Sequence, residues 1–447
     1  MVYSTGFLKL SAGSIGASLF ALALLTGFDR AAAQSFVPAS TNSAGNSPNA
    51  IVTADFTGDS RPDFAVVDFS DNALSVLIYN GSGSFVTDSK PGVGPGPSSI
   101  ALADVNGDGK PDLICANGTD GTLTILTNNS VGGFSAAATV SVGSSTYEPE
   151  AVIAADVNGN GVPALISANF NNNSLTVLTN FNGNYFIVSS PGVGVQPVAL
   201  AAADVNGDGK VDLICANYNN DAASMLTVLT NGGGGRFTIA SSPNVGSGPI
   251  SVAAADLNGD GKPDLVCANY GGNSLTVLTN NGSGKFTAAP SPPGVGSNPD
   301  GVAVADVNGD GKPDLICANY SGNSLTVLTN RGGAVFGLAG TFSVGTQPAA
   351  VAVADVNNDG KPDLISANFG ADTVTILTNN LAFTPPPLNI AQAAGQVVVF
   401  YPQSNLRFTL QITTNLISGP WVTASNGVPV TAFTFSNTSP ASFFRLH

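Results

Sequence analysis

Histidine is almost absent from this chain of 447 residues, whose one histidine, His447, is the last residue. A Ser-His or Cys-His nucleophile would therefore have no general base. Zinc sites lack ligands as well, because the four cysteines fall in separate sequence repeats. Paired aspartates could hydrolyse glycosidic bonds, but nearly every clustered aspartate belongs to the metal-binding pattern described below. We therefore expect a protein that is not an enzyme.

Basic residues are also scarce, with 14 Lys and Arg against 29 Asp and Glu, so that the formal net charge is -15. Nucleic-acid binding requires clustered Lys and Arg to neutralise phosphates. An acidic surface is repelled by anionic membranes for the same electrostatic reason. The composition therefore predicts that neither nucleic acid nor an anionic membrane is a partner.

Long apolar runs are lacking after the first 33 residues. Residues 1–33 read as an export signal, with Lys9 as a weak basic start and an apolar run from Leu10 to Phe28. The small residues 31–33 offer a cleavage site before Gln34. A permanent anchor is the alternative, but the run is short and broken by Ser and Gly. We expect a secreted or cell-surface protein with no membrane span after cleavage.

An Asp-rich motif recurs seven times, starting at Asp55, Asp104, Asp156, Asp204, Asp256, Asp306 and Asp355, in steps of 48 to 52 residues. Each period holds four runs with strand character, bounded by Gly, Asn, Asp or Pro. Four antiparallel strands in about 50 residues are typical of a propeller blade. An open β-solenoid normally has a shorter period. The sequence predicts an all-β fold, a seven-bladed β-propeller over residues 34–384.

The ends of the repeat array predict how the ring closes. A Phe stands about 19 residues before each later motif, at Phe85, Phe134, Phe186, Phe237, Phe286 and Phe336. Phe36 stands in the same register before Asp55, without the three strands that would precede it in a full repeat. The last repeat has a truncated fourth strand. The segment at 35–45 is therefore predicted to complete the seventh blade and remove an exposed sheet edge.

The four cysteines, Cys115, Cys215, Cys267 and Cys317, occupy one position of the repeat, which Ser167 and Ser366 fill in two other copies. Equivalent positions of neighbouring blades lie too far apart for a disulfide, which needs Cα atoms within about 7 Å. We expect these cysteines to be buried and unpaired.

The repeated loop D-x-N-x-D-G-x-x-D carries side-chain oxygens at positions one, three, five and nine, and a backbone carbonyl at position seven. Calcium takes six to eight oxygen ligands, and glycine at position six permits the tight turn. Magnesium needs stricter geometry and keeps more waters. The loop predicts calcium at Asp55, Asp59, Asp63, Asp104, Asn106, Asp108, Asp112, Asp204, Asn206, Asp208, Asp212, Asp256, Asn258, Asp260, Asp264, Asp306, Asn308, Asp310, Asp314, Asp355, Asn357, Asp359 and Asp363.

The seven loops are not equal. The first has Thr57 at position three and Ser60 at position six but is still expected to bind, and the third has Asn160 at position five and Ala164 at position nine. With Asp156 as its only carboxylate, the third loop is expected to be empty or weak. About five to six calcium ions are therefore predicted. Nineteen of the 29 acidic residues lie in these loops, so the net charge is mainly charge of the predicted metal sites.

The repeats resemble FG-GAP/VCBS repeats, which occur in integrin α-chain propellers and in secreted bacterial proteins. The resemblance covers roughly residues 35–380 and implies a seven-bladed propeller with calcium between strands one and two. Some lyases and phospholipases carry this repeat, so the resemblance leaves an enzyme, for instance a polysaccharide-active one, as an alternative. The sequence departs from the family after strand two, where "ANY" or "ANF" replaces a Gly-Ala-Pro segment.

Aromatic residues follow strand two in five copies, ahead of Asn- and Gly-rich loops: Phe170, Tyr218, Tyr270, Tyr320 and Phe369. These loops are expected on the face opposite the calcium loops. Rings beside Asn amides suit polyhydroxyl ligands, whereas packing between blades and turn formation are the alternative roles. We expect an exported binding or adhesion module for an extracellular glycan or protein. A structural surface scaffold without a ligand is the alternative.

Residues after the repeats have a different pattern. Residues 385–387 are prolines and predict a stiff linker. Residues 388–447 contain short strand patterns and Trp421, and their ending resembles a small C-terminal β module of secreted proteins of environmental bacteria. We expect a small β-sandwich-like module, with a surface-attachment or sorting tag as the alternative.

Overall fold

The structure is a computed structural model that describes residues 8–11, 35–80, 84–181, 183–218, 224–289 and 294–380 and six further strands between residues 389 and 446. The chain divides into two compact units. One unit spans Ala33–Leu381, and the other joins Met1–Ala32 with Ala382–His447.

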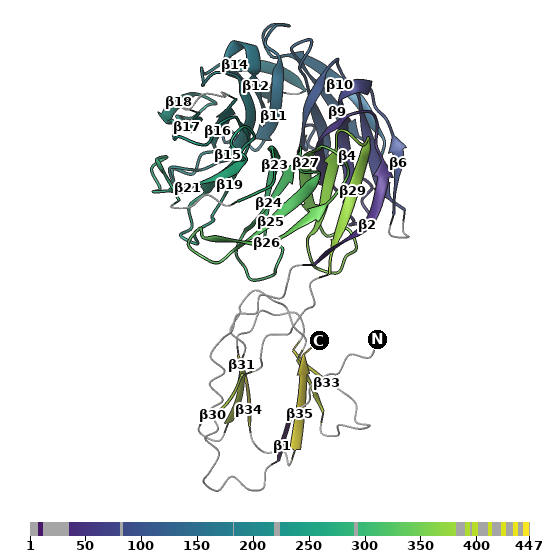
Figure 1. Cartoon of the computed structure of the whole chain (residues 1–447), viewed down its shortest axis with the longest axis vertical. Coiled ribbons are helices and arrows are strands. Elements are labelled where there is room, and N and C mark those ends of the chain that lie inside the picture. Colours follow the sequence, from purple (N-terminus) through teal and green to yellow (C-terminus); the bar gives the residue numbers. More distant parts are fainter. Residues whose placement is uncertain are drawn as a thin grey trace. The chain divides into compact units, whose positions relative to one another are not determined.

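The first unit is a β-propeller of seven four-stranded antiparallel sheets within its described residues. The first strand of each sheet lies around the middle of the ring, and the fourth lies at the periphery (Figure 1). The helical elements of the described residues are two 3-10 turns, η1 (Phe69–Asp71) and η2 (Phe170–Asn172). The predicted all-β fold and the seven-bladed propeller are confirmed.

The strands follow in order from the centre outward. Blade 1 contains β3 (Pro48–Ala54), β4 (Asp63–Asp68), β5 (Ala73–Tyr79) and β6 (Phe85–Ser89), and blade 2 contains β7 (Pro97–Ala103), β8 (Asp112–Asn117), β9 (Thr122–Asn128) and β10 (Phe134–Ser141). Blade 3 contains β11 (Pro149–Ala155), β12 (Ala164–Asn169), β13 (Ser174–Phe181) and β14 (Asn184–Ser189), and blade 4 contains β15 (Pro197–Ala203), β16 (Asp212–Asn217), β17 (Leu226–Asn231) and β18 (Phe237–Ser241). Blade 5 contains β19 (Pro249–Ala255), β20 (Asp264–Asn269), β21 (Ser274–Asn280) and β22 (Phe286–Ala288), and blade 6 contains β23 (Pro299–Ala305), β24 (Asp314–Asn319), β25 (Ser324–Asn330) and β26 (Phe336–Ser343). Blade 7 contains β27 (Pro348–Ala354), β28 (Asp363–Asn368), β29 (Thr373–Asn379) and β2 (Phe36–Ser43).

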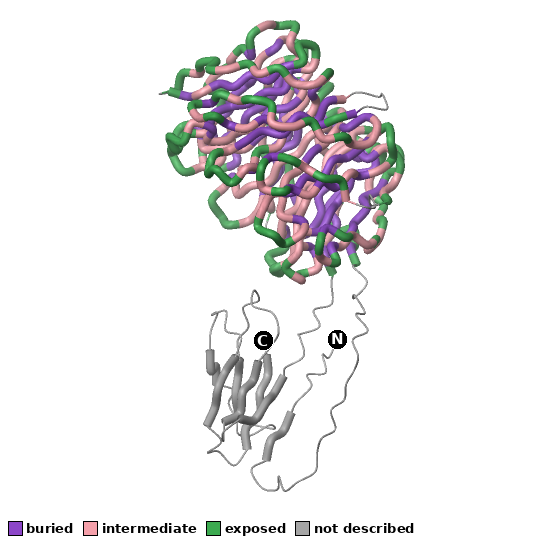
Figure 2. Tube along the Cα trace, turned by 90° about the vertical axis from the view of Figure 1, so that its left-hand side faces the viewer, coloured by how far each residue is buried: buried purple, intermediate pink, exposed green. Residues whose placement is uncertain are grey.

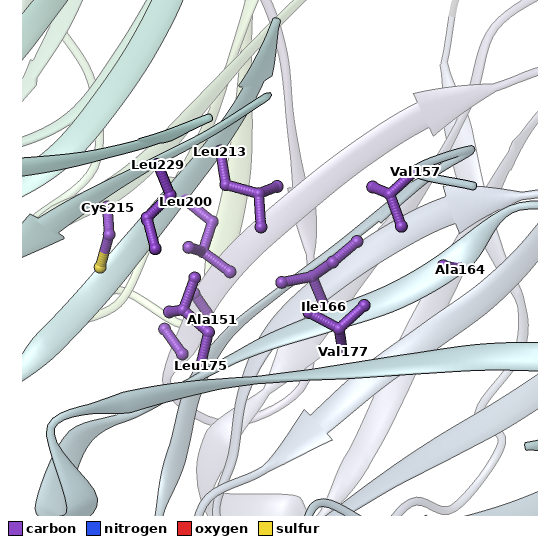
Figure 3. Close-up of a cluster of buried hydrophobic side chains, with 11 residues drawn as sticks. Ala151, Val157, Ala164, Ile166, Leu175, Val177, Leu200, Leu213, Cys215 and Leu229 are labelled. Carbon is purple, nitrogen blue, oxygen red and sulfur yellow. The ribbon is translucent and has the colours of Figure 1, made fainter. Parts of the chain in front are cut away.

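The core lies between blades. Every residue of the second strands is buried, because both faces of these strands meet a neighbouring sheet, and Figure 2 shows the buried segments inside the ring beneath exposed loops. Apolar side chains from adjacent blades form shared clusters. In one of them, Ile166 and Val177 of blade 3 face Leu200 and Leu213 of blade 4 (Figure 3). Each blade therefore depends on its two neighbours for burial of its apolar surface.

The N-terminal strand closes the ring as predicted. Strand β2 pairs antiparallel with β29, from Phe36 opposite Asn379 to Ser43 opposite Thr373. The N–H of Asn380 donates to the carbonyl of Ser35 at 2.8 Å. Phe36 is 6% exposed and packs edge-on against Phe342 of blade 6, with ring centroids 5.1 Å apart.

One predicted register is wrong. Phe186 was expected in the position of the other fourth-strand phenylalanines, but it is 57% exposed. Tyr185 occupies that position instead, opposite Asn180, and packs against the core cluster of blades 2 and 3. The reason is a hairpin shortened by one residue: Asn180 pairs with Tyr185, whereas Asn128 pairs with Phe134.

The four cysteines are free and buried, as expected. Cys115, Cys215, Cys267 and Cys317 are each 0% exposed and lie in the clusters between blades. Burial raises the pKa of each thiol, which disfavours the reactive thiolate. Their role is packing.

The second unit is described only as strands. They are β1 (Leu8–Ser11), β30 (Asn389–Ala393), β31 (Gln396–Phe400), β32 (Leu410–Thr413), β33 (Val422–Ser425), β34 (Ala432–Ser436) and β35 (Ala441–Leu446). Their order is β1-β35-β32-β33 in one sheet and β30-β31-β34 in another. The linker 385–387, Trp421 and His447 lie outside the described residues. The export signal 1–33 and the sandwich-like module 388–447 stay predictions. Among the described residues, no helix is long and apolar enough to cross a membrane.

Truncating Phe36 tests the closure of the ring. Phe36 and Phe85 are equally buried, at 6% exposure, so Phe36→Ala and Phe85→Ala should each lower the free energy of unfolding by about 3–5 kcal/mol. The exposed Phe186 provides the control, because Phe186→Ala should cost well under about 1 kcal/mol. Denaturant unfolding at saturating calcium measures all three. A Phe36→Ala variant as stable as Phe186→Ala would show that the N-terminal strand does not hold the ring.

Candidate functional site

The predicted calcium loops connect the first and second strand of each blade and have the same backbone geometry. In blade 5, Asp256 at position one accepts hydrogen bonds from the N–H groups of Gly259 at 2.7 Å, Asp260 at 3.1 Å and Gly261 at 2.8 Å. Asn258 accepts one from Asp260 at 2.8 Å. Gly261 has a φ of 81°, in the left-handed region that glycine adopts without strain.

Position nine has a structural role that the sequence did not predict. In blade 5, Asp264 is 0% exposed, and its carboxylate accepts the N–H of Leu257 at 3.1 Å and that of Asn280 at 2.7 Å. The carboxylate thus ties the loop to the third strand. The other five position-nine aspartates make the same pair of bonds: Asp63, Asp112, Asp212, Asp314 and Asp363.

The donor set of the loops fits a calcium ion. Among the described residues, no three Asp, Glu, His or Cys side chains group closely enough to hold a metal ion. A calcium ion would therefore be held by the carboxylates of positions one and five together with amide and backbone carbonyl oxygens, which are hard ligands of the kind calcium prefers. Whether position nine also contributes an oxygen stays a prediction. At position seven, the Lys ammonium pairs with the position-five carboxylate, as Lys312 does with Asp310 at 2.9 Å.

The third loop keeps its shape without most of its acids. Asp156 accepts the N–H groups of Gly159 at 2.8 Å and Gly161 at 2.7 Å, as in the complete loops. Ala164 is 1% exposed at position nine and offers no oxygen. In the first loop, Ser60 replaces glycine at a φ of 66°, a conformation that strains a residue with a Cβ. Both loops therefore depart from the pattern as the sequence indicates.

An asparagine at the end of the third strand connects each loop to the next blade. Asn280 of blade 5 donates from Nδ2 to the carbonyl of Val205 in the blade 4 loop at 2.9 Å and to its own blade's Pro263 carbonyl at 3.0 Å. The same inter-blade bond is made by Asn128, Asn180, Asn231, Asn330 and Asn379. Blade 1 has Tyr79 at this place, with the Arg61 guanidinium 4.5 Å above its ring.

The predicted ligand-binding aromatics lie on the opposite face of the propeller, each just after a second strand. The rings of Tyr270 and Tyr320 are 6.1 Å apart, and those of Tyr320 and Phe369 are 6.2 Å apart. All three are half-buried, so they line blades 5 to 7 as a continuous aromatic arc. Tyr218 precedes this arc in blade 4 and affects the pKa of Tyr270.

Three positions of this face differ from the arc. Phe170 takes the equivalent position in blade 3, at the start of η2, without a ring contact to the arc. Phe69 takes it in blade 1 and is 43% exposed. Phe69 is not among the aromatic residues predicted from the sequence, although it follows strand two like the others. Blade 2 has Gly118 at this position, so the series of aromatic residues around this face is interrupted at blade 2.

A cavity of about 590 Å³ runs among the first strands of all seven blades, and Tyr320 and Phe369 of the arc also line it. The residue after the leading Pro of each first strand faces this cavity: Asn49, Ser98, Glu150, Val198, Ile250, Asp300 and Ala349. Among its described lining residues, Glu150 and Asp300 are the only acidic ones. We call this cavity the central channel.

Burial shifts the pKa of both channel acids. It raises the pKa of Asp300 to about 7, and burial together with the charge of Glu148 raises the pKa of Glu150 to about 7. Burial and then the nearby Asp300 charge raise the pKa of Tyr320, and the same two causes lead for Tyr270. Asp300 therefore lies close to the aromatic arc.

The fold and the loops define a class, the propellers built from repeats with an Asp-rich loop between their first two strands. Six segments match the family model described as FG-GAP-like repeat, at residues 55–115, 104–167, 156–215, 204–267, 256–317 and 306–366. These segments cover well over half of the chain, which belongs to this family.

Solved structures show the same fold at low sequence identity. The crystal structure of BBS1N in complex with ARL6DN, soaked with lead, matches with a TM-score of 0.56 and 15% identity over 78% of this chain and 98% of that chain. A catalytically inactive virginiamycin B lyase from Staphylococcus aureus with quinupristin matches with a TM-score of 0.51 and 17% identity over 77% and 98%. No curated protein matches the sequence.

The asparagine bridge between blades can be tested at Asn280. Asn280→Ala leaves two buried carbonyls without their donor, which should lower the free energy of unfolding by about 1–3 kcal/mol. The adjacent Asn281 is exposed, so Asn281→Ala should cost about 0.5 kcal/mol or less. Denaturant unfolding of the two variants compares them directly. Equal stabilities would contradict a bridging role for Asn280.

The channel acids predict a pH dependence of stability. Because their pKa values are higher in the folded state, the folded protein binds more protons between about pH 4 and 7, and the free energy of unfolding falls as pH rises through this window. Asp300→Asn and Glu150→Gln should each become more stable relative to the wild type from about pH 5 to 8. Unfolding of each variant and the wild type at both pH values, at equal calcium, measures this. A pH-independent difference would contradict the prediction.

Proposed function

We propose that the protein is an exported, calcium-loaded propeller that binds an extracellular glycan or protein and has no enzymatic activity. The observation that carries this proposal is the aromatic arc of Tyr270, Tyr320 and Phe369 at the mouth of the central channel. Half-buried rings on a rigid face provide large contact areas at little cost in conformational entropy. Asn273 and Asn323, in the loops that follow Tyr270 and Tyr320, supply side-chain amide donors for a polar ligand.

Neighbouring folds are compatible with a binding role. BBS1N, whose structure matches this fold with a TM-score of 0.56, was crystallised in complex with ARL6DN. The identity of 15% transfers the fold and not the partner. For this chain the choice of a binding role rests on its own arc and channel, and on the lack of a histidine base in the propeller sequence.

The proposed calcium binding and the proposed export of the protein are consistent with each other. Extracellular calcium modules bind with dissociation constants of about 10⁻⁴–10⁻³ M, near the calcium concentrations outside cells. The loops crowd many carboxylates onto one face, and bound ions would offset this repulsion. A ligand that binds only the folded state raises its stability by mass action.

Binding by the arc can be tested with a glycan array and a panel of extracellular proteins, probed with the wild type, Tyr270→Ala and Phe369→Ala. Loss of a specific signal in both variants is expected. Phe181→Ala is the control, because Phe181 is 69% exposed in another part of the propeller. Retention of all signals in the arc variants, or no specific signal for the wild type, would reject the arc as the binding face.

Calcium stoichiometry tests the individual loops. Asp260→Ala and Asp310→Ala should each reduce bound calcium by about one ion per chain, as counted by equilibrium dialysis with metal analysis. Asp156→Ala should leave the count unchanged but lower stability, because Asp156 holds the backbone of its loop. Asp88→Ala, which removes an exposed acid outside the loops, controls for the change in net charge. Equal losses in all four variants would contradict loop-specific binding, and a melting temperature that millimolar calcium leaves unchanged would contradict stabilisation by calcium.

A further inference from the structure

Asp300 and Glu150 are carboxylates without a partner inside the central channel. Among the described residues, neither carboxylate accepts a hydrogen bond or pairs with a cation, and the raised pKa of Asp300 has burial as its only cause. Among the described residues, no Lys or Arg lines the channel. Both acids are half-buried, and a carboxylate that is partly withdrawn from water and is neither paired nor hydrogen-bonded costs free energy, so a cationic ligand would relieve this cost.

The two acids occupy the same register position in blades 3 and 6 and lie three blades apart around the ring. They therefore face the channel from different sides. Among the described residues that line the channel, Glu150 and Asp300 are the only acids, and none is His or Cys. The channel consequently offers single carboxylates for an organic cation and not a ligand set for a divalent metal.

The surroundings of Asp300 specify the cation further. Tyr320 and Phe369 line the same cavity, and aromatic faces attract cations by their quadrupole. Around them the wall is aliphatic, with Ile250, Val302 and Val351. A carboxylate, aromatic rings and an aliphatic wall together suit a charged group at the end of an aliphatic chain, which buries its stem and pairs its head.

The side of the channel at Glu150 differs, because the aromatic residues among its described lining, Tyr320 and Phe369, belong to blades 6 and 7. Blade 2 has Gly118 in the position of the aromatics, and a Cβ built on Gly118 would lie 3.8 Å from Oε1 of Glu150. The cation–π component is therefore available only beside Asp300. The channel volume of about 590 Å³ falls within the range of small-molecule sites and is larger than the volume of one side chain.

We propose that the central channel binds an alkylammonium group, with Asp300 as its counter-ion and Tyr320 and Phe369 as its aromatic wall. The ammonium is carried by a lysine side chain of an extracellular protein or by a free alkylamine, which share this chemistry. The inference rests on the proposed binding function and deepens it, since it names the chemical group that the mouth of the channel recognises.

Isothermal titration of the calcium-saturated full chain tests this proposal with Nα-acetyl-lysine methylamide and its uncharged analogue Nα-acetyl-norleucine methylamide. The lysine compound should bind, and the norleucine compound should bind at least about tenfold more weakly, because it lacks the charge. Equal affinities would overturn the proposal. Titration with 1,4-diaminobutane separates the sources: if the diamine binds and the lysine compound does not, the lysine source is overturned while the ammonium site stands.

Matched variants locate the counter-ion. Asp300→Asn keeps the shape and removes the charge, and it should weaken lysine binding at least about tenfold, with Tyr320→Ala weakening it less. Asp120→Asn removes the charge of another acid on the same face, outside the channel lining, and should leave the affinity unchanged. Loss of binding in Glu150→Gln together with retention in Asp300→Asn would overturn the assignment to Asp300.

Folding of the variants is measured separately from binding. Asp300→Asn removes an unneutralised buried charge, so a normal melting curve is expected and shows that lost binding is local. The wild-type protein separates this inference from the proposed function. Binding of the lysine compound without any specific glycan or protein signal would reject the proposed function alone, and a specific glycan or protein signal without binding of the lysine compound or the diamine would reject this inference alone.

Discussion

Backbone groups at the bend between the first and second strands must find hydrogen-bond partners in the buried interior, and the rest of the propeller depends on how they do so. In six blades a buried aspartate such as Asp264 accepts the N–H of position two of the loop and an N–H of the third strand. In blades 2 to 7 the asparagine at the end of the third strand, such as Asn280, donates to the position-two carbonyl of the preceding blade. The aspartate thus links the loop to the third strand of its own blade, and the asparagine links that strand to the loop of the neighbouring blade.

The junction between blades 7 and 1 is built differently from the other six. Tyr79 replaces the bridging asparagine, and Asp68 replaces the asparagine that ends the second strand elsewhere. Asp68 is buried and accepts hydrogen bonds from the hydroxyl of Ser75 at 2.7 Å and the N–H of Gly45 at 2.9 Å. Gly45 follows strand β2, so this carboxylate fixes the closing segment to blade 1. The junction at which the chain joins its own beginning therefore uses different side chains from the other six junctions.

The regular features of the fold were predictable from the sequence, and the irregular ones were not. Period and strand pattern indicated seven blades, and the position of Phe36 indicated the closing strand. The exposed Phe186 was misplaced because its hairpin is one residue shorter, which the spacing alone did not reveal. The bridging asparagines were visible in six repeats, but their partners lie in the preceding blade. Glu150 and Asp300 each occur once, and only the closed ring shows that they share a channel.

Pairing of Ser35 with Asn380 has a mechanical consequence for any anchoring of the molecule. Both ends of the propeller segment leave at one point on the rim of blade 7, so a tether on either end would hold the disc at that point alone. Pulling the two ends apart would break the β2–β29 hydrogen bonds one after another, starting from Ser35 and Asn380, and would leave the other six blades without tension. The ring would therefore open at this single pair of strands before any other blade is disturbed.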